Sequence, residues 1–128
     1  MTAAILTANA DAYDSARWRL GERLAATGIP ASRIDVGLEW SGWHSASGVI
    51  DTPPTGASPA SLLWVQQLFS HQEPCAFATN YSLDRATLDA DRLSRRGSYG
   101  YRTYLIAGHA RLYVYAIAAP GCRRDARS

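Results

Sequence analysis

The stretch RIDVGLEWSGWH, residues 33–44, holds the side chains of this chain that are best suited to chemistry. Asp35 and Glu39 supply two carboxylates, and Trp43 and His44 follow closely. In an extended strand, the Cα atoms of residues 35 and 39 would lie about 13 Å apart. Paired carboxylates of glycoside hydrolases lie only about 5 to 9.5 Å apart. These two carboxylates are therefore not expected to form a hydrolytic pair by themselves.

The same residues could instead form a ligand-binding surface. Glu39 is predicted at the carboxyl end of a parallel strand, where α/β proteins bind ligands, although a structural hydrogen-bonding role would also suit it. An exposed indole at Trp43 would stack on a sugar ring. The structural alternative is a loop tryptophan folded back over the core. The candidate ligand-binding residues are Asp35, Glu39, Trp43 and His44, and no catalytic residue is assigned.

Several kinds of site are not supported by the sequence. His44, His71 and His109 show no metal-ligand spacing, so no metal site is predicted. No GxSxG stretch marks a nucleophilic serine, and no GxGxxG or P-loop stretch marks a nucleotide. No cofactor is therefore predicted.

The charge and hydropathy of the chain limit its partners. The net charge of +2 over 128 residues is too small to indicate nucleic acid or an anionic membrane, and no apolar run is long enough to predict insertion into a membrane. All 13 basic residues are arginine, which with the many alanines indicates a GC-rich genome. Arginines cluster at 92, 95 and 96 and at 123, 124 and 127. These clusters are interpreted as a solvated loop and a tail, with a phosphate-binding patch as the alternative.

Hydrophobic periodicity predicts the order of the elements. We expect strands at 3–7, 34–40 and 75–79, a helix from Asn9 or Asp11 to Gly28, and a second helix at 58–71. An irregular loop is predicted at 41–55, and a loop or short helix at 84–96. Residues 99–107 and 111–118 should form an antiparallel hairpin around Gly108-His109, with the second strand in the sheet interior.

This order predicts a layered α/β fold. We expect one domain over residues 1–120, with a mixed sheet of about five strands and two main helices, and a flexible C-terminal tail over 121–128. The pairing of Cys75 with Cys122 stays open, because a buried free thiol at the start of the 75–79 strand would be equally reasonable.

Several of these stretches together resemble a known family. They are GIP at 28–30, IDVGLEWSG at 34–42, CAFAT at 75–79, YRTY at 101–104 and LYVY at 112–115. The chain from residue 16 to residue 115 resembles the soluble C-terminal region of bacterial membrane glycosyltransferase-like proteins, relatives of protein mannosyltransferases and aminoarabinose transferases. The catalytic acids of those enzymes lie near the start of the membrane portion, which has no counterpart here, so none is carried over.

The resemblance implies a non-catalytic extracytoplasmic domain of a membrane-bound glycosyltransferase-like protein, which would contact a sugar, a polyprenyl-phosphate sugar or the acceptor. Two other hypotheses follow from the residues themselves. One is a small stand-alone hydrolase or transferase that uses Asp35, Glu39 and His44 and would be cytoplasmic. The other is a protein–protein interaction module that uses the tyrosine-rich hairpin.

Overall fold

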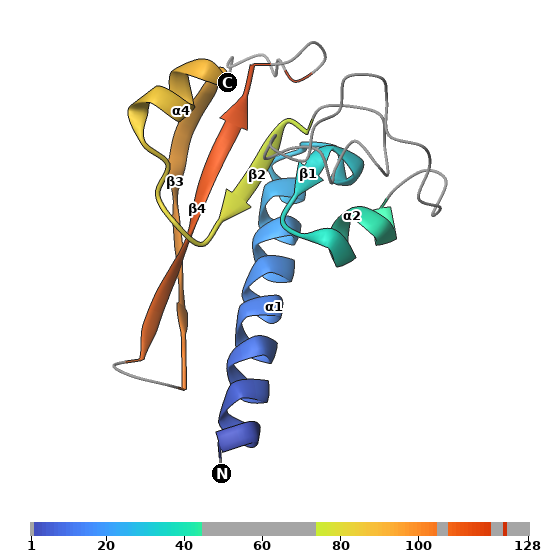
Figure 1. The fold of residues 1–128 in the computed structure, drawn as a ribbon. Coiled ribbons are helices and arrows are strands. Elements are labelled where there is room, and N and C mark those ends of the chain that lie inside the picture. The colour runs from blue at the N-terminus through green and yellow to red at the C-terminus, as the bar shows by residue number, and fades with distance from the viewer. Residues whose placement is uncertain (1, 45–73, 105–107, 119–121, 123–128) are drawn as a thin grey trace.

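The computed structural model describes residues 2–44, 74–104, 108–118 and 122, and it shows an α/β fold with a four-stranded mixed sheet (Figure 1). The elements are α1 (Thr2–Ala26), the 3-10 helix η1 (Ala31–Arg33), β1 (Ile34–Asp35), α2 (Leu38–His44), β2 (Ala76–Thr79), α4 (Arg85–Ala90), β3 (Leu93–Arg102) and β4 (His109–Ile117). The strand order is β1-β2-β4-β3. β1 and β2 are parallel, whereas β4 is antiparallel to both of its neighbours.

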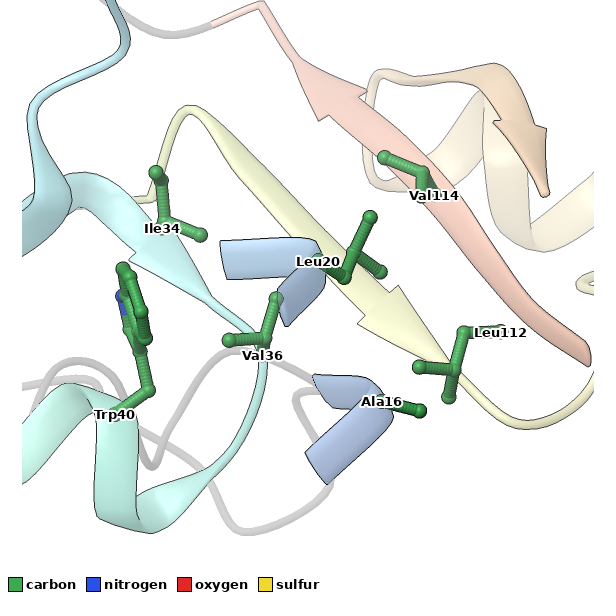
Figure 2. Packing of buried hydrophobic residues seen from close by; sticks show 7 residues of the cluster. All are labelled: Ala16, Leu20, Ile34, Val36, Trp40, Leu112 and Val114. Atoms are coloured by element: carbon green, nitrogen blue, oxygen red, sulfur yellow. The ribbon is translucent and has the colours of Figure 1, made fainter. Parts of the chain in front are cut away.

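The predicted interior position of β4 is confirmed, because β4 lies between β2 and β3. Its alternating residues face two separate cores. Leu112 and Val114 pack on one face, against α1, and Tyr115 and Ile117 pack on the other. Figure 2 shows the first cluster, in which side chains from α1, β1, α2 and β4 converge. Its buried members are Ala16, Leu20, Ile34, Val36, Trp40, Leu112 and Val114.

The second core lies under α4. Leu83 and Leu88 pack against it, and the hydroxyl of Tyr115 accepts a hydrogen bond from the backbone N–H of Leu83 at 2.8 Å. α4 begins at an N-cap, because the Asp84 carboxylate accepts from the Thr87 N–H at 2.8 Å. The short helix that was one alternative for residues 84–96 is therefore present, and β3 follows it.

The strand predicted at residues 3–7 is wrong, because these residues belong to α1. A short apolar run cannot by itself distinguish a strand from a helix, and the alanine-rich N-terminal sequence favours a helix. The predicted C-terminal end of this helix is confirmed. α1 ends at Ala26, and Gly28 has a φ of 88°, the left-handed conformation in which glycine follows a helix.

The strand predicted over residues 34–40 is also wrong beyond Asp35. The Asp35 carboxylate accepts from the Gly37 N–H at 3.2 Å, which turns the chain. The Gly37 carbonyl then accepts from the Ser41 N–H at 3.0 Å, so α2 begins where strand and loop were expected. Val36 and Trp40 are buried, but Leu38 is 52 % exposed.

The remaining predictions are met in part. The strand at 75–79 is confirmed as β2, and the hairpin strands pair antiparallel, although β3 begins at Leu93 and not at residue 99. Four strands are described where about five were expected. The helix at 58–71, most of the loop at 41–55 and most of the tail at 121–128 lie outside the described residues. The division into one domain and a tail therefore stays a prediction.

Cys75 and Cys122 form a disulfide, which decides between the two alternatives that the sequence left open. Their Cα atoms lie 5.2 Å apart, within the usual range for a disulfide. Cys122 packs against the second core, so the bond attaches the chain beyond β4 to the start of β2. None of the helices among the described residues combines the length and apolar character that crossing a membrane requires.

Candidate functional site

Arg17 of α1 lies at the centre of the candidate site. Its Nη2 donates to Asp14 Oδ1 at 2.7 Å and to Glu39 Oε2 at 2.8 Å, and its guanidinium group lies 4.7 Å from the ring centre of Tyr13. The side chain is only 19 % exposed. Its Nε is buried and has no hydrogen-bond partner among the described residues. Arg17 thus joins α1 to α2 through one largely buried cation.

Gly37 is the residue that lets Arg17 reach this position. Its φ of +136° is unfavourable for a residue with a side chain. A Cβ atom at Gly37 would lie 2.6 Å from Cζ of Arg17, well inside van der Waals contact. The glycine therefore serves both the turn after β1 and the close packing of the guanidinium group.

Asp35 lies beside this cation at the end of β1. Burial raises the pKa of Asp35 above its ordinary value, and this effect outweighs the Gly37 N–H, the charge of Arg17 and a hydrogen bond with Ser41, which all lower the pKa. The carboxyl group is thus held by the turn that ends β1. We therefore assign Asp35 a structural role.

The two faces of α2 have different roles. Trp40 and His44 are four residues apart and share the inner face, because residues four apart are neighbours on a helix. The Trp40 indole is 3 % exposed and donates to the Ala31 carbonyl at 3.1 Å. Its ring packs so closely on α1 that a Cβ at Gly21 would lie 2.7 Å from it. This contact fixes α2 against α1.

His44 completes an aromatic cluster on the inner face of α2. Its ring centre lies 3.9 Å from that of Trp40 and 5.7 Å from that of Trp18. Trp18 and Trp40 meet edge-on with 5.0 Å between their ring centres. The Nδ1 of His44 lies 3.0 Å from the Trp40 carbonyl oxygen, which accepts a hydrogen bond when Nδ1 carries the proton. His44 is therefore positioned by packing against Trp40 and Trp18.

Glu39 and Trp43 share the outer face of α2, again four residues apart. The Trp43 side chain is 78 % exposed, so the folded-back arrangement considered from the sequence is not the one in the structure. The Glu39 side chain is 65 % exposed, and one of its oxygens is held by Arg17. No described residue is found bonded to the second oxygen, which can accept from a ligand hydroxyl because an ionised carboxylate accepts through both oxygens.

A cavity of about 310 Å³ lies between α1 and α2, and its lining includes Glu39 but not Trp43. It is lined by Asp14, Ser15, Arg17, Trp18, Val36, Glu39 and Trp40. A second cavity of about 560 Å³ lies between α1 and β3, and its lining includes none of the four candidate residues. Within the described residues, no group of three or more His, Cys, Asp or Glu side chains could hold a metal ion.

The structure separates the four candidate residues into three settings. Glu39 and Trp43 share an exposed face, His44 packs on the inner face, and Asp35 is enclosed at the turn. Arg17 was not among the candidate residues predicted from the sequence. The signal that could have indicated it was the glycine at position 37 inside an apparent strand, since such a glycine often marks the close approach of another group.

Comparison of the chain with protein-family models, with curated proteins and with solved structures finds no match. The function is therefore argued from the geometry of α2 and its surroundings, together with the sequence resemblance described above.

Proposed function

We propose that this chain is a non-catalytic, extracytoplasmic domain of a membrane-bound glycosyltransferase-like protein, and that the outer face of α2 contacts a sugar. The observation that carries the sugar contact is the pairing of an exposed indole at Trp43 with the Glu39 carboxylate one helical turn away. The indole offers an apolar face for the C–H side of a sugar ring. The carboxylate accepts hydrogen bonds from its hydroxyl groups.

The fixed inner face of α2 supports this proposal. Trp40 is buried against Gly21, and Arg17 holds Glu39, so the backbone beneath the outer face is already positioned. A preorganised surface loses less conformational entropy when a ligand binds. The exposed pair is therefore suited to weak, specific contact with a sugar.

The Cys75–Cys122 disulfide supports the extracytoplasmic setting. Disulfides persist in oxidising compartments and are rare where thiol reductants are abundant. Trapping free thiols in intact producing cells tests this part. We expect both cysteines to be protected until the protein is denatured and reduced, whereas two freely alkylated thiols would contradict the setting.

A nuclear magnetic resonance titration tests the sugar contact. The four tryptophans give four indole N–H signals, and Trp43→Ala identifies the one that belongs to residue 43. The probes are the methyl glycosides of mannose, glucose and arabinose, and farnesyl phosphate. We expect saturable movement of the Trp43 signal with at least one glycoside.

The controls for this titration separate sugar contact from general effects. Glu39→Gln should abolish saturable movement of the Trp43 signal, and Trp43→Ala should show no saturable movement of the three indole signals that remain. Tyr81→Ala removes another exposed aromatic side chain, outside α2, and should leave the titration unchanged. Saturable movement that persists in the three remaining indole signals of Trp43→Ala, or no saturable movement of the Trp43 signal with any glycoside, would refute the sugar contact.

A further inference from the structure

The two strands of the β3–β4 hairpin carry positive charge without any acidic residue. The segments LSRRGSYGYR and HARLYVYAI contain four arginines and one histidine, and neither contains Asp or Glu. Arg95 and Arg96 were expected on a solvated loop. In the structure they lie on β3, and Arg102, His109 and Arg111 are added by the rest of the hairpin.

The register of the hairpin places most of these charges on one face. Residues paired across antiparallel strands share a face. Ser98 pairs with Tyr113, Gly100 with Arg111, and Arg102 with His109. The groups on this side are Arg95, Ser98, Arg102, His109, Arg111 and Tyr113, which together we name the basic hairpin face.

Two side-chain contacts confirm this arrangement. The guanidinium group of Arg95 lies 4.9 Å from the ring centre of Tyr113. Arg111 Nη1 donates to Ser98 Oγ at 2.9 Å. Neither contact uses a carboxylate, and the ion pairs found among the described residues involve none of Arg95, Arg102 and Arg111.

The basic hairpin face is open to solvent. Arg95, Arg102, His109 and Arg111 are all exposed. α4 lies beside the start of β3, and the hairpin extends well beyond it (Figure 1). Arg95 and Arg102 are seven residues apart along β3, so the face is about 20 Å long.

The opposite face of the hairpin is covered by α1. The ring centres of Tyr101 and Tyr13 lie 6.1 Å apart. The ring centre of Tyr99 lies 5.2 Å from the guanidinium group of Arg23. Only one side of the ribbon is therefore available to a partner. That partner must be anionic and extended over about 20 Å.

We propose that the basic hairpin face docks on an anionic phospholipid surface. This inference rests on the proposed function, which places the domain beside a membrane. Arginine recognises phosphate through several parallel N–H donors. A flat ribbon with charges along one side matches a planar array of phosphates. Attachment to a membrane protein would make even weak docking effective, because it raises the local concentration of the face.

The geometry disfavours duplex nucleic acid as the partner. A two-stranded ribbon can enter a major groove about 12 Å wide. Here α1, itself about 10 Å in diameter, is packed on the back of the ribbon and would collide with the groove walls. Nucleic acid is retained as an outcome of the test.

Vesicle co-sedimentation of the full chain tests the proposal. The vesicles contain either phosphatidylcholine alone or phosphatidylcholine with one third phosphatidylglycerol. We expect binding only to the anionic vesicles, and its loss in high salt. Each basic residue near an anionic surface contributes about fivefold to partitioning, so Arg95→Gln/Arg102→Gln/Arg111→Gln should bind about 100-fold more weakly.

A matched variant controls for net charge. Arg19→Gln/Arg23→Gln/Arg85→Gln also removes three positive charges, but from α1 and α4, and should bind far better than the hairpin variant. Circular dichroism checks that both variants are folded. Equal binding by the two variants, or equal binding to neutral vesicles, would overturn the proposal.

Two further arms separate the remaining outcomes. Binding of a labelled 20-base-pair DNA without binding to anionic vesicles would show a nucleic-acid surface instead and overturn the proposal. Trp43→Ala should still bind vesicles, and the hairpin variant should still give the glycoside titration. Failure of membrane docking is thus distinguishable from failure of the sugar contact.

Discussion

Gly37 lies directly against the guanidinium group of Arg17, and there is no room for a Cβ atom between them. This contact joins the turn after β1 to the middle of α1. From the same position Arg17 reaches Glu39, which is 22 residues away in the sequence. The packing of one glycine therefore determines where a carboxylate of the proposed binding face lies.

Replacing Gly37 with alanine should destabilise the protein by about 3 kcal/mol. Part of the loss comes from the φ of +136° and part from the collision with Arg17. Urea unfolding measures it. Gly97→Ala is the matched control, since Gly97 also has a positive φ of +153° but nothing lies within 4 Å of an added Cβ.

A double-mutant cycle separates the two contributions. In an Arg17→Ala background the collision is absent, so Gly37→Ala should cost no more than Gly97→Ala does. An unchanged penalty in that background would show that Arg17 does not pack against Gly37.

Replacement by alanine should lower stability strongly at Trp40 and hardly at all at Trp43. Trp40→Ala removes a ring that is 3 % exposed and should cost about 3 to 5 kcal/mol of unfolding free energy. Trp43→Ala removes an exposed ring and should change stability by no more than about 0.5 kcal/mol. Denaturant unfolding of both variants under one condition makes the comparison. Similar losses would contradict the two-faced arrangement of α2.

Asp35→Asn should reveal the raised pKa of Asp35 as a pH dependence of stability. Because burial raises this pKa in the folded state, the folded protein binds the proton more tightly than the unfolded chain does. The stability that this provides is present below the unfolded pKa and is lost as pH rises through the folded value. The wild type should therefore lose stability relative to Asp35→Asn as pH rises from about 3.5 to 7.

Asp84→Asn provides a control of opposite sign. The hydrogen bonds from Thr87 lower the pKa of Asp84, so its contribution is present above the unfolded pKa and is lost as pH falls through the folded value. The wild type should gain stability relative to Asp84→Asn as pH rises. Unfolding curves for all three proteins across this range measure both slopes. Parallel slopes for the two variants would count against the enclosed carboxyl at Asp35.

The parts of the fold that the sequence predicts well depend on one local pattern. The helix end at Gly28 follows from a glycine that adopts a left-handed conformation just beyond a helix. The interior position of β4 follows from its apolar residues on both faces. In both cases the residues that decide the structure lie within or next to the element that they predict.

The stretch after Ile34 shows why the remainder was missed. Alternation at Val36, Leu38 and Trp40 fits a strand, but residues four apart also share a helix face, so Val36 and Trp40 suit both structures. The Asp35–Gly37 turn ends the strand, and a helix follows it. Arg17 was missed for a different reason, because its contacts with Gly37 and Glu39 join segments far apart in sequence.

Removing the disulfide should destabilise the protein by about 4 kcal/mol. The bond closes a loop with a sequence separation of 47, and in the chain-entropy model a loop of this length restricts the unfolded chain by that amount. Thermal unfolding of Cys75→Ala/Cys122→Ala measures the loss, and wild-type protein refolded in reductant should lose a similar amount. Since Cys75 is 5 % exposed, reductant added to the folded protein should act slowly, at the rate of opening around β2. An unchanged melting temperature in the double variant would show that the bond contributes nothing to stability.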